Sequence, residues 1–163
     1  MINHIKPRNK KTFSLNNSCI IISILKQYVK SQPIFKKAKK HGYLLFKLKS
    51  LKFRDSNRSC FVVSNQCQKF IISELGQQDY LQNFEILYPT ISLIKITNGE
   101  MSKKREINNA ISILKEKGIY PIAHKLSVDS YDLVVNVSDS VKALCHLYDK
   151  LIHFDKTTFE QAG

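Results

Sequence analysis

The sequence predicts an α+β protein in which one order of elements, strand, helix, strand, strand, helix and a further strand, occurs twice in tandem. Short apolar runs of strand length alternate with segments of helical periodicity, and each copy takes about 70 residues. A hydrophobic content of 43% also favours a folded chain over a disordered one. A helix between two strands, followed by a hairpin, gives a ferredoxin-like unit, an antiparallel sheet with both helices on one face.

The first unit is predicted to span residues 13–88, after a basic flexible arm at residues 1–12. Its first long strand is Cys19–Leu25, a nearly continuous apolar run of the kind found in strands buried on both faces. Residues 13–15 are expected to form a short strand of their own.

A basic helix is expected next, from Val29 to His41. Ser31 is a suitable N-cap, Pro33 is tolerated in a first turn, and Gly42 is a typical residue after a helix end. The apolar stripe of this helix is thin and its opposite face carries lysines.

A hairpin and a second helix complete the first unit. The strand Tyr43–Arg54 alternates apolar and basic residues, but the alternation changes phase at Ser50, which predicts a β-bulge there. The returning strand is expected at residues 59–64, the helix at residues 67–75 and a short last strand at residues 83–87.

The second unit is predicted to span residues 89–154, with a loose tail at residues 155–163. Pro89 is expected to separate its first strand, residues 90–97, from the strand before it. The helix at residues 106–117 has the clearest periodicity of the chain. Its apolar residues are Ile107, Ala110, Ile111 and Leu114.

A second hairpin, residues 119–127 and 131–137, precedes a last helix that Ser138 or Asp139 is expected to cap. The apolar face expected for this helix comprises Val141, Leu144, Cys145, Tyr148, Leu151 and Ile152. Each unit is too small to bury much surface alone, so the uncovered faces are expected to pack on each other or on a second chain.

The net charge of +13 is concentrated in the first third of the chain. Residues 1–60 contain 15 Lys or Arg and one acid, whereas residues 61–163 contain 11 Lys or Arg and 12 acids. A basic surface is therefore expected there, made of Lys36, Lys37, Lys39, Lys40, Lys47, Lys49, Lys52 and Arg54.

Three interpretations of the basic surface stay open. It could bind nucleic acid, since Tyr43, Phe46 and Phe53 are interleaved with the lysines, although their alternation is expected to turn these rings toward the helices. It could dock on an acidic protein. It could also be a solvated face, since lysines on an edge strand protect against aggregation.

Catalytic, metal and cofactor sites are not indicated. The chain has no Gly-rich phosphate loop, no nucleophile with a local base and no paired carboxylates at a strand end, so a non-enzyme without a cofactor is expected. Four cysteines lack CxxC spacing and are expected to be buried free thiols, with zinc or a disulfide as alternatives. No apolar run has the length of a membrane span and no secretory signal is evident, so a cytoplasmic protein is expected.

Three segments of the second unit carry a family resemblance. Residues 110–119, AISILKEKGI, and residues 131–148, YDLVVNVSDSVKALCHLY, follow a loop with the sequence Asn98-Gly99-Glu100-Met101. This pattern resembles an ACT domain, specifically the C-terminal regulatory half of aspartokinases. The resemblance covers roughly 60 residues, and the first unit matches it in the order and length of its elements.

The resemblance implies a pair of ACT domains that bind a small amino acid such as lysine or threonine. It also implies control of an enzyme through dimer contacts, either as a homodimer or as the partner of a catalytic aspartokinase-type subunit. A separate regulatory subunit without a kinase segment is the expected form. The alternative is a basic module of the same fold that has lost the ligand and binds nucleic acid or an acidic protein through residues 1–54.

The resemblance also assigns candidate ligand-binding residues. In the first unit these are Lys26, Gln27, Tyr28 and Val29 in the loop after the first strand, with Phe46 on the second strand; in the second unit they are Thr97, Asn98, Met101 and Ser127. The sequence departs from the family at Phe46, where the family has an aspartate that meets the ligand amine. The alternative is that the second-unit residues are ordinary loop and turn residues.

Overall fold

The computed structural model describes residues 11–31, 33–49, 57–97 and 103–160. The strands are β1 (Thr12–Leu25), β2 (Leu45–Leu48), β3 (Arg58–Ser64), β4 (Phe84–Thr97), β5 (Ala123–Leu126) and β6 (Ser130–Asn136). The helices are α1 (Lys26–Ser31), α2 (Ile34–Lys40), α3 (Asn65–Leu75), α4 (Gln77–Asn83), α5 (Lys103–Glu116) and α6 (Ser140–Glu160), with a 3-10 turn, η1 (Val137–Asp139), before α6.

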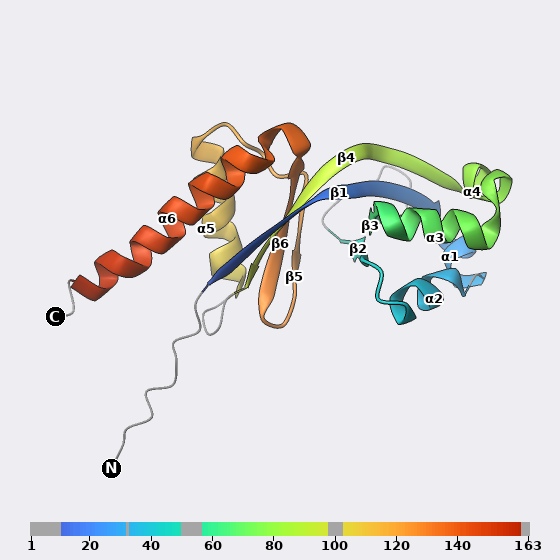
Figure 1. The fold of residues 1–163 in the computed structure, drawn as a ribbon, viewed down its shortest axis with the longest axis horizontal. Helices are drawn as coiled ribbons and strands as arrows, with labels where there is room; N and C mark the ends of the chain where they lie inside the picture. The colour runs from blue at the N-terminus through green and yellow to red at the C-terminus, as the bar shows by residue number, and fades with distance from the viewer. Residues whose placement is uncertain (1–10, 32, 50–56, 98–102, 161–163) are drawn as a thin grey trace, which may run out of the picture.

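The predicted α+β class with antiparallel strands is confirmed. The strands form a six-stranded sheet in the order β2-β3-β1-β4-β6-β5, and every pairing in it is antiparallel. Figure 1 shows α1 to α4 beside one end of this sheet and α5 and α6 beside the other. The two expected sheets are thus joined into one.

The join is made by β1 and β4, which pair along their length and run through both parts of the molecule (Figure 1). The first half-sheet consists of β2, β3, residues 19–25 of β1 and residues 84–88 of β4; the second consists of β5, β6, residues 91–97 of β4 and residues 12–16 of β1. Each half has the strand order of a ferredoxin-like unit. The fourth strand of the first half-sheet is the part of β4 at residues 84–88, and the fourth strand of the second half-sheet is the part of β1 at residues 12–16.

Residues 13–15 are therefore not a separate strand, because β1 is continuous from Thr12 to Leu25. Thr12, expected in the flexible arm, begins that strand, and residues 1–10 lie outside the described residues. The pairing puts Phe13 and Leu15 against β4 in the second half-sheet, opposite Ile96 and Ile94. The division of the chain at residues 88 and 89 stays a prediction.

Pro89 does not end the preceding strand, because β4 is continuous from Phe84 to Thr97. The β1–β4 register changes between Asn16 and Cys19 and again between Cys19 and Ile22, which are β-bulges. Pro89 falls in this interrupted stretch, where a residue without an N–H costs no ladder hydrogen bond. The hydroxyl of Ser92 donates to Asn17 Oδ1 at 2.6 Å and ties the two strands together there.

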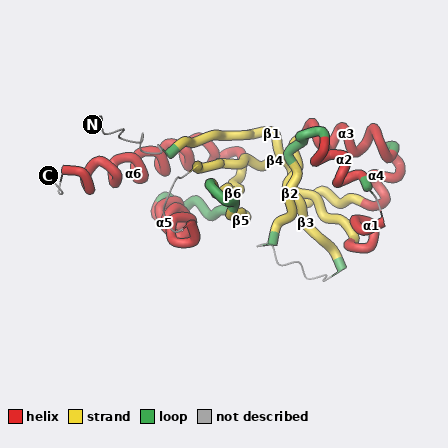
Figure 2. The backbone as a smooth tube through the Cα atoms, turned by 90° about the horizontal axis from the view of Figure 1, so that it is seen from below, coloured by secondary structure: helices red, strands yellow, loops and turns green. Residues whose placement is uncertain are grey.

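Three apolar clusters fill the described part of the molecule. One lies under α2 and α3 and contains Ile22, Ile24 and Phe61; a second lies under α5 and α6 and contains Ile94, Ile96 and Leu133. The third, on the opposite face of the strands, draws residues from both half-sheets, including Ile21 and Leu93. The edge strands β2 and β5 contact each other in the middle of the molecule (Figure 2), so the sheet curves around this third cluster.

The sheet register shows that the two half-sheets are copies of one plan. The Cα partner of Ile22 is Phe61, and the Cα partner of Ile94 is Leu133, and these four residues occupy matching positions in the first two clusters. The third cluster contains matched positions as well, with Ile21 opposite Val62 and Leu93 opposite Val134.

The helix expected at residues 29–41 is two helices. Lys26 to Ser31 form α1, and α2 begins only at Ile34, after Pro33, since proline suits the start of a helix and not its interior. Ser31 therefore ends α1, and the N-cap position of α2 is Pro33. Gly42 follows α2 with a φ of 77°, the left-handed conformation that favours glycine.

Other elements agree with the periodicities. The helices expected at residues 67–75 and 106–117 are α3 and α5, and both hairpins form, although β5 is shorter than residues 119–127. The helix α4 was not predicted. The β-bulge expected at Ser50, with Lys52, Phe53 and Arg54, lies outside the described residues.

The face that the last helix buries agrees with the expected one at Leu151 and at the half-buried Leu144, and differs from it elsewhere. Ala143, Leu147 and Leu151, spaced by four, are buried, whereas Val141, Cys145 and Tyr148 are exposed. The helix begins at Ser140, whose hydroxyl donates to the carbonyl of Val137, and it continues to Glu160 where a loose tail was expected.

Cys19, Cys60 and Cys67 are buried free thiols, as expected, and Cys145 is a free thiol on the surface. Burial raises the pKa of the Cys19 and Cys67 thiols to about 11. Within the described part of the chain, no group of His, Cys, Asp and Glu side chains has the arrangement of a metal site. None of the helices described there combines the length and the apolar character that a membrane span requires.

We expect Leu15→Ala to lower the free energy of unfolding by about 1–3 kcal/mol, because Leu15 packs on the second apolar cluster across β4. Urea unfolding followed by circular dichroism measures this change. The matched control is Ser14→Ala at the exposed neighbouring position, with an expected change within about 0.5 kcal/mol. Equal stability of Leu15→Ala and the wild type would contradict the shared strand.

Candidate functional site

The candidate site is a group of charged residues on the inner face of the second half-sheet, the face that carries the third cluster. Lys95 on β4 and Lys125 on β5 are the Cα partners of Asp132, which lies between them on β6. Side chains of directly opposed residues lie on the same face of a sheet, so the three charges form one row across three strands. Tyr131 and Leu133, the neighbours of Asp132, point instead into the helix-covered cluster.

Asp132 is the buried member of the row, with 5% of its surface exposed. Its Oδ1 atom is buried and has no hydrogen-bond partner within residues 11–31, 33–49, 57–97 and 103–160. Burial raises the pKa of the Asp132 carboxyl group, and the nearby charges of Lys95 and Lys125 lower it by less. A buried acceptor without a hydrogen-bond donor costs desolvation free energy. A donor from outside the chain that reached this carboxylate would recover part of that cost.

Lys125 connects the row to the first half of the molecule. Its Nζ atom lies 4.4 Å from the centroid of the Phe46 ring on β2, a cation–π contact between the two edge strands. Burial lowers the pKa of Lys125, the Asp132 charge raises it, and the charges of Lys39 and Lys95 lower it further. Lys39 of α2 is thus close enough to act on Lys125 electrostatically. We call Lys39, Phe46, Lys95, Lys125 and Asp132 the charged seam.

The matching positions of the first half-sheet carry no such charges. The sheet register equates Lys95 with Ser23, Asp132 with Cys60 and Lys125 with Leu48, since Cys60 is the Cα partner of both Ser23 and Leu48. Cys60 and Leu48 are members of the third apolar cluster. The fold therefore accepts apolar residues where the second half-sheet has two charges.

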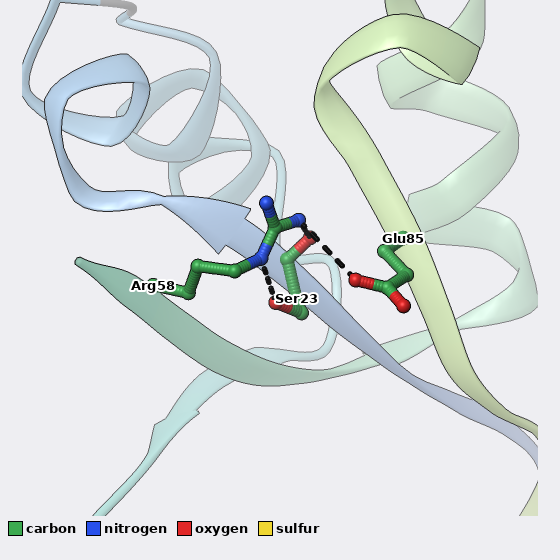
Figure 3. Close-up of polar contacts among 3 residues, drawn as sticks. All are labelled: Ser23, Arg58 and Glu85. Carbon is green, nitrogen blue, oxygen red and sulfur yellow. Dashed lines mark hydrogen bonds and ion pairs between the residues drawn. The ribbon is translucent and has the colours of Figure 1, made fainter. Parts of the chain in front are cut away.

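The first half-sheet has a different polar contact at this end. Arg58 Nε donates to Ser23 Oγ at 2.6 Å, Arg58 Nη2 donates to the Ser23 carbonyl oxygen at 3.1 Å, and Nη2 lies 3.7 Å from Glu85 Oε2 (Figure 3). These contacts tie β3, β1 and β4 together across the strand ends. The arginine is already engaged by its own chain, so this cluster is structural in character.

The first-unit ligand residues do not form a loop. Lys26, Gln27, Tyr28 and Val29 are in α1, with Tyr28 and Val29 packed against the first cluster and Lys26 and Gln27 exposed. The backbone N–H of Lys26 donates to the carbonyl of Asn57 at 2.7 Å, and this contact holds the start of α1 against the end of the loop before β3.

Phe46 points away from this helix. The expectation that it faces the helices was wrong, because Phe46 and Leu48 belong to the third cluster on the opposite face of β2. Tyr43, in contrast, packs against the first cluster, as expected. Phe46 therefore meets Lys125 of the second half instead of the loop after the first strand.

In the second unit, Thr97 and Ser127 lie at one end of the sheet. Thr97 is the Cα partner of Ser130, and the N–H of Ser127 donates to the Ser130 carbonyl at 2.9 Å. Asn98 and Met101 lie outside the described residues. The charged seam begins two positions further along β4 and β6, at Lys95 and Asp132.

The expected basic surface is described in part. Lys36, Lys37, Lys39 and Lys40 are exposed on α2, and Lys47 and Lys49 are exposed on or next to β2; Lys52 and Arg54 lie outside the described residues. Lys37 Nζ is 3.5 Å from Glu74 Oε2 on α3, which anchors one lysine of the group.

Lys95, Lys125 and Asp132 were not predicted as site residues. The available signal was a carboxylate inside a strand whose other residues are apolar, Tyr131-Asp132-Leu133-Val134-Val135. In a strand buried on both faces, an ionised residue marks the place where one face meets a polar group.

No family model and no curated protein matches this chain. Solved structures do match. The ligand-free regulatory subunit of aspartate kinase from Thermus thermophilus is 14% identical, with a TM-score of 0.62 over 84% of this chain and 95% of that one. A C-terminal regulatory domain from Porphyromonas gingivalis, described as that of an aspartate kinase, is 13% identical, with a TM-score of 0.52 over 87% and 97%.

The aspartokinase III of Escherichia coli in complex with lysine and aspartate is 12% identical, with a TM-score of 0.53. That match covers 90% of this chain and 34% of the longer enzyme. The chain therefore has the fold of the ACT-domain regulatory regions of aspartate kinases, as the second-unit pattern predicted.

Proposed function

We propose that this chain is a non-catalytic regulatory protein of the aspartokinase type, which binds a small amino acid and controls a partner enzyme or its own dimer state. The observation that carries the proposal is the match in fold to a separate regulatory subunit over 95% of that subunit's length. A chain with this fold and no catalytic constellation in its sequence is suited to sensing and not to chemistry.

The effector class proposed is that of lysine or threonine. A lysine complex of a matching enzyme supports the first of these. We propose that the effector binds at the end of the second half-sheet, near Thr97 and Ser127, which share Ser130 as a pairing partner. Asn98 and Met101 complete this proposed site by sequence position.

The same fold is the basis for proposing that the chain controls a partner protein. Either a second copy or a catalytic subunit of the aspartokinase type is the proposed partner, since two ACT units transmit an effector signal only if binding changes a contact with another chain.

Isothermal titration of the full chain against the twenty amino acids tests the sensor role. We expect heat of binding for lysine or threonine, and about a fivefold weaker affinity for Thr97→Val, because one hydroxyl hydrogen bond contributes about 1 kcal/mol. Ser112→Ala, on the exposed face of α5, is the matched control and should bind as the wild type does. A folded protein that gives no heat with any amino acid would refute the sensor role.

A second candidate function is favoured by the lysines exposed on α2 and β2. In this alternative, the chain is a basic interaction module that binds nucleic acid or an acidic protein through residues 1–54, without an amino-acid effector. The surplus positive charge of that region is the physical reason, because lysine contacts to phosphates release counterions.

A gel-shift titration with RNA and DNA at several salt concentrations tests this alternative. The triple change Lys36→Glu, Lys40→Glu and Lys47→Glu should weaken binding and reduce the salt slope by about 0.9 for each phosphate that is no longer neutralised. The control is Lys104→Glu, Lys115→Glu and Lys117→Glu, which makes the same charge change in the second half. Equal affinities of the two triple variants would exclude the basic surface as the binding face.

A further inference from the structure

The charged seam contains an acceptor that the described residues do not satisfy. Asp132 Oδ1 is buried and has no donor among them, although two lysines are its cross-strand neighbours. Buried carboxylate oxygens nearly always have hydrogen-bond partners, and an orphan of this kind needs an explanation. A bound group that brings its own N–H donors to Oδ1 would provide one.

The fold does not require charges at these positions. The first half-sheet has the same strand order and register, and it has Cys60 where the second has Asp132 and Leu48 where the second has Lys125. The apolar version packs in the third cluster. Asp132 and Lys125 cost desolvation energy at positions where Cys60 and Leu48 do not. We therefore attribute to these two charges a role other than packing.

The charges around Asp132 indicate the kind of ligand. Lys95 and Lys125 are the cross-strand neighbours of Asp132, and the charge of Lys39 acts on Lys125. Three ammonium groups and one carboxylate leave a surplus of two positive charges. A ligand with one ammonium group and two carboxylates complements this arrangement, whereas a cationic side chain would face repulsion.

The seam can be reached from solvent on its lysine side. Lys39 and Lys95 are exposed and Lys125 is half-buried, whereas Asp132 and Phe46 are buried. Exposed ammonium groups beside a buried carboxylate favour a ligand with its carboxylates toward the lysines and its ammonium group toward Asp132.

We propose that the charged seam binds a small zwitterion with an additional acidic group, a dicarboxylic amino acid, whose ammonium group donates to Asp132 and whose carboxylates contact Lys39, Lys95 and Lys125. This site adjoins the effector site proposed near Thr97, two positions along β4, and differs from it in ligand class. Since Lys39 and Phe46 belong to the first half and the other three residues to the second, the ligand bridges the two edge strands β2 and β5.

Isothermal titration of the full chain with aspartate, glutamate, succinate, lysine and threonine tests the proposal. Aspartate or glutamate should bind the wild type, and Asp132→Asn should weaken that binding about tenfold or more, because it removes the charge that holds the ammonium group. Lys125→Leu, which installs the first-half residue, should weaken it similarly. Lys115→Met on the exposed face of α5 is the charge-matched control and should leave the affinity unchanged.

The variants should remain folded. Burial raises the pKa of the Asp132 carboxyl group, so ionised Asp132 lowers stability at neutral pH, and Asp132→Asn should melt at the same temperature as the wild type or higher. Thermal melting of each variant separates a defect in binding from a defect in folding.

The outcomes distinguish this site from the proposed effector site. Acidic amino acids that bind the wild type and Asp132→Asn equally, or that give no heat with the wild type, would overturn the seam proposal. Succinate binding as tightly as aspartate would also overturn it, since succinate lacks the ammonium group.

Lysine or threonine binding that Asp132→Asn does not change would leave the regulatory function standing without the seam. Aspartate heat that disappears in Asp132→Asn, with no heat from lysine or threonine, supports the seam and counts against the proposed effector class.

Discussion

The pairing of β1 with β4 is the interaction on which the rest of the structure depends. Each of these strands is 14 residues long, and each serves as an inner strand of one half-sheet and as the fourth strand of the other. The second half has its four strands only with residues 12–16, which are remote in sequence from its other strands, whereas the strands of the first half all lie within residues 19–88. The long pair crosses both halves, so unfolding of one half-sheet removes a paired strand from the other. The two half-sheets therefore depend on each other for stability.

Much of the fold could be predicted from sequence because the signals are local. The periodicity of residues 106–117 gives α5, and alternating or continuous apolar runs give most strands. Strand continuity could not be predicted, because Asn16, Asn17 and Pro89 are residues typical of turns. They occur at bulges inside the long strands, where Asn17 accepts a hydrogen bond from Ser92 and Pro89 needs no ladder partner. The continuity of β1 and β4 is evident only from their long-range pairing.

The candidate site shows where residue patterns are insufficient. Phe46 was selected because of its place in the family pattern, but its contact with Lys125 depends on the curvature that brings β2 to β5. Asp132 is visible in the sequence as an acid in an apolar strand, yet its two lysine neighbours, Lys95 and Lys125, come from two other strands. Cross-strand register is a tertiary property, and it could not be predicted from this single sequence.

The arrangement of the halves also gives the charged seam a mechanical significance. The halves are joined covalently and by hydrogen bonds through β1 and β4 in the centre of the sheet, and they meet again at the outer strands β2 and β5. The central join is backbone pairing with bulges between Asn16 and Ile22, whereas the outer contact is made by side chains such as Phe46 and Lys125. A group held at the outer contact touches both halves of the molecule. Binding that differs between two arrangements of the halves would favour one of them, which is the physical requirement for a regulatory signal.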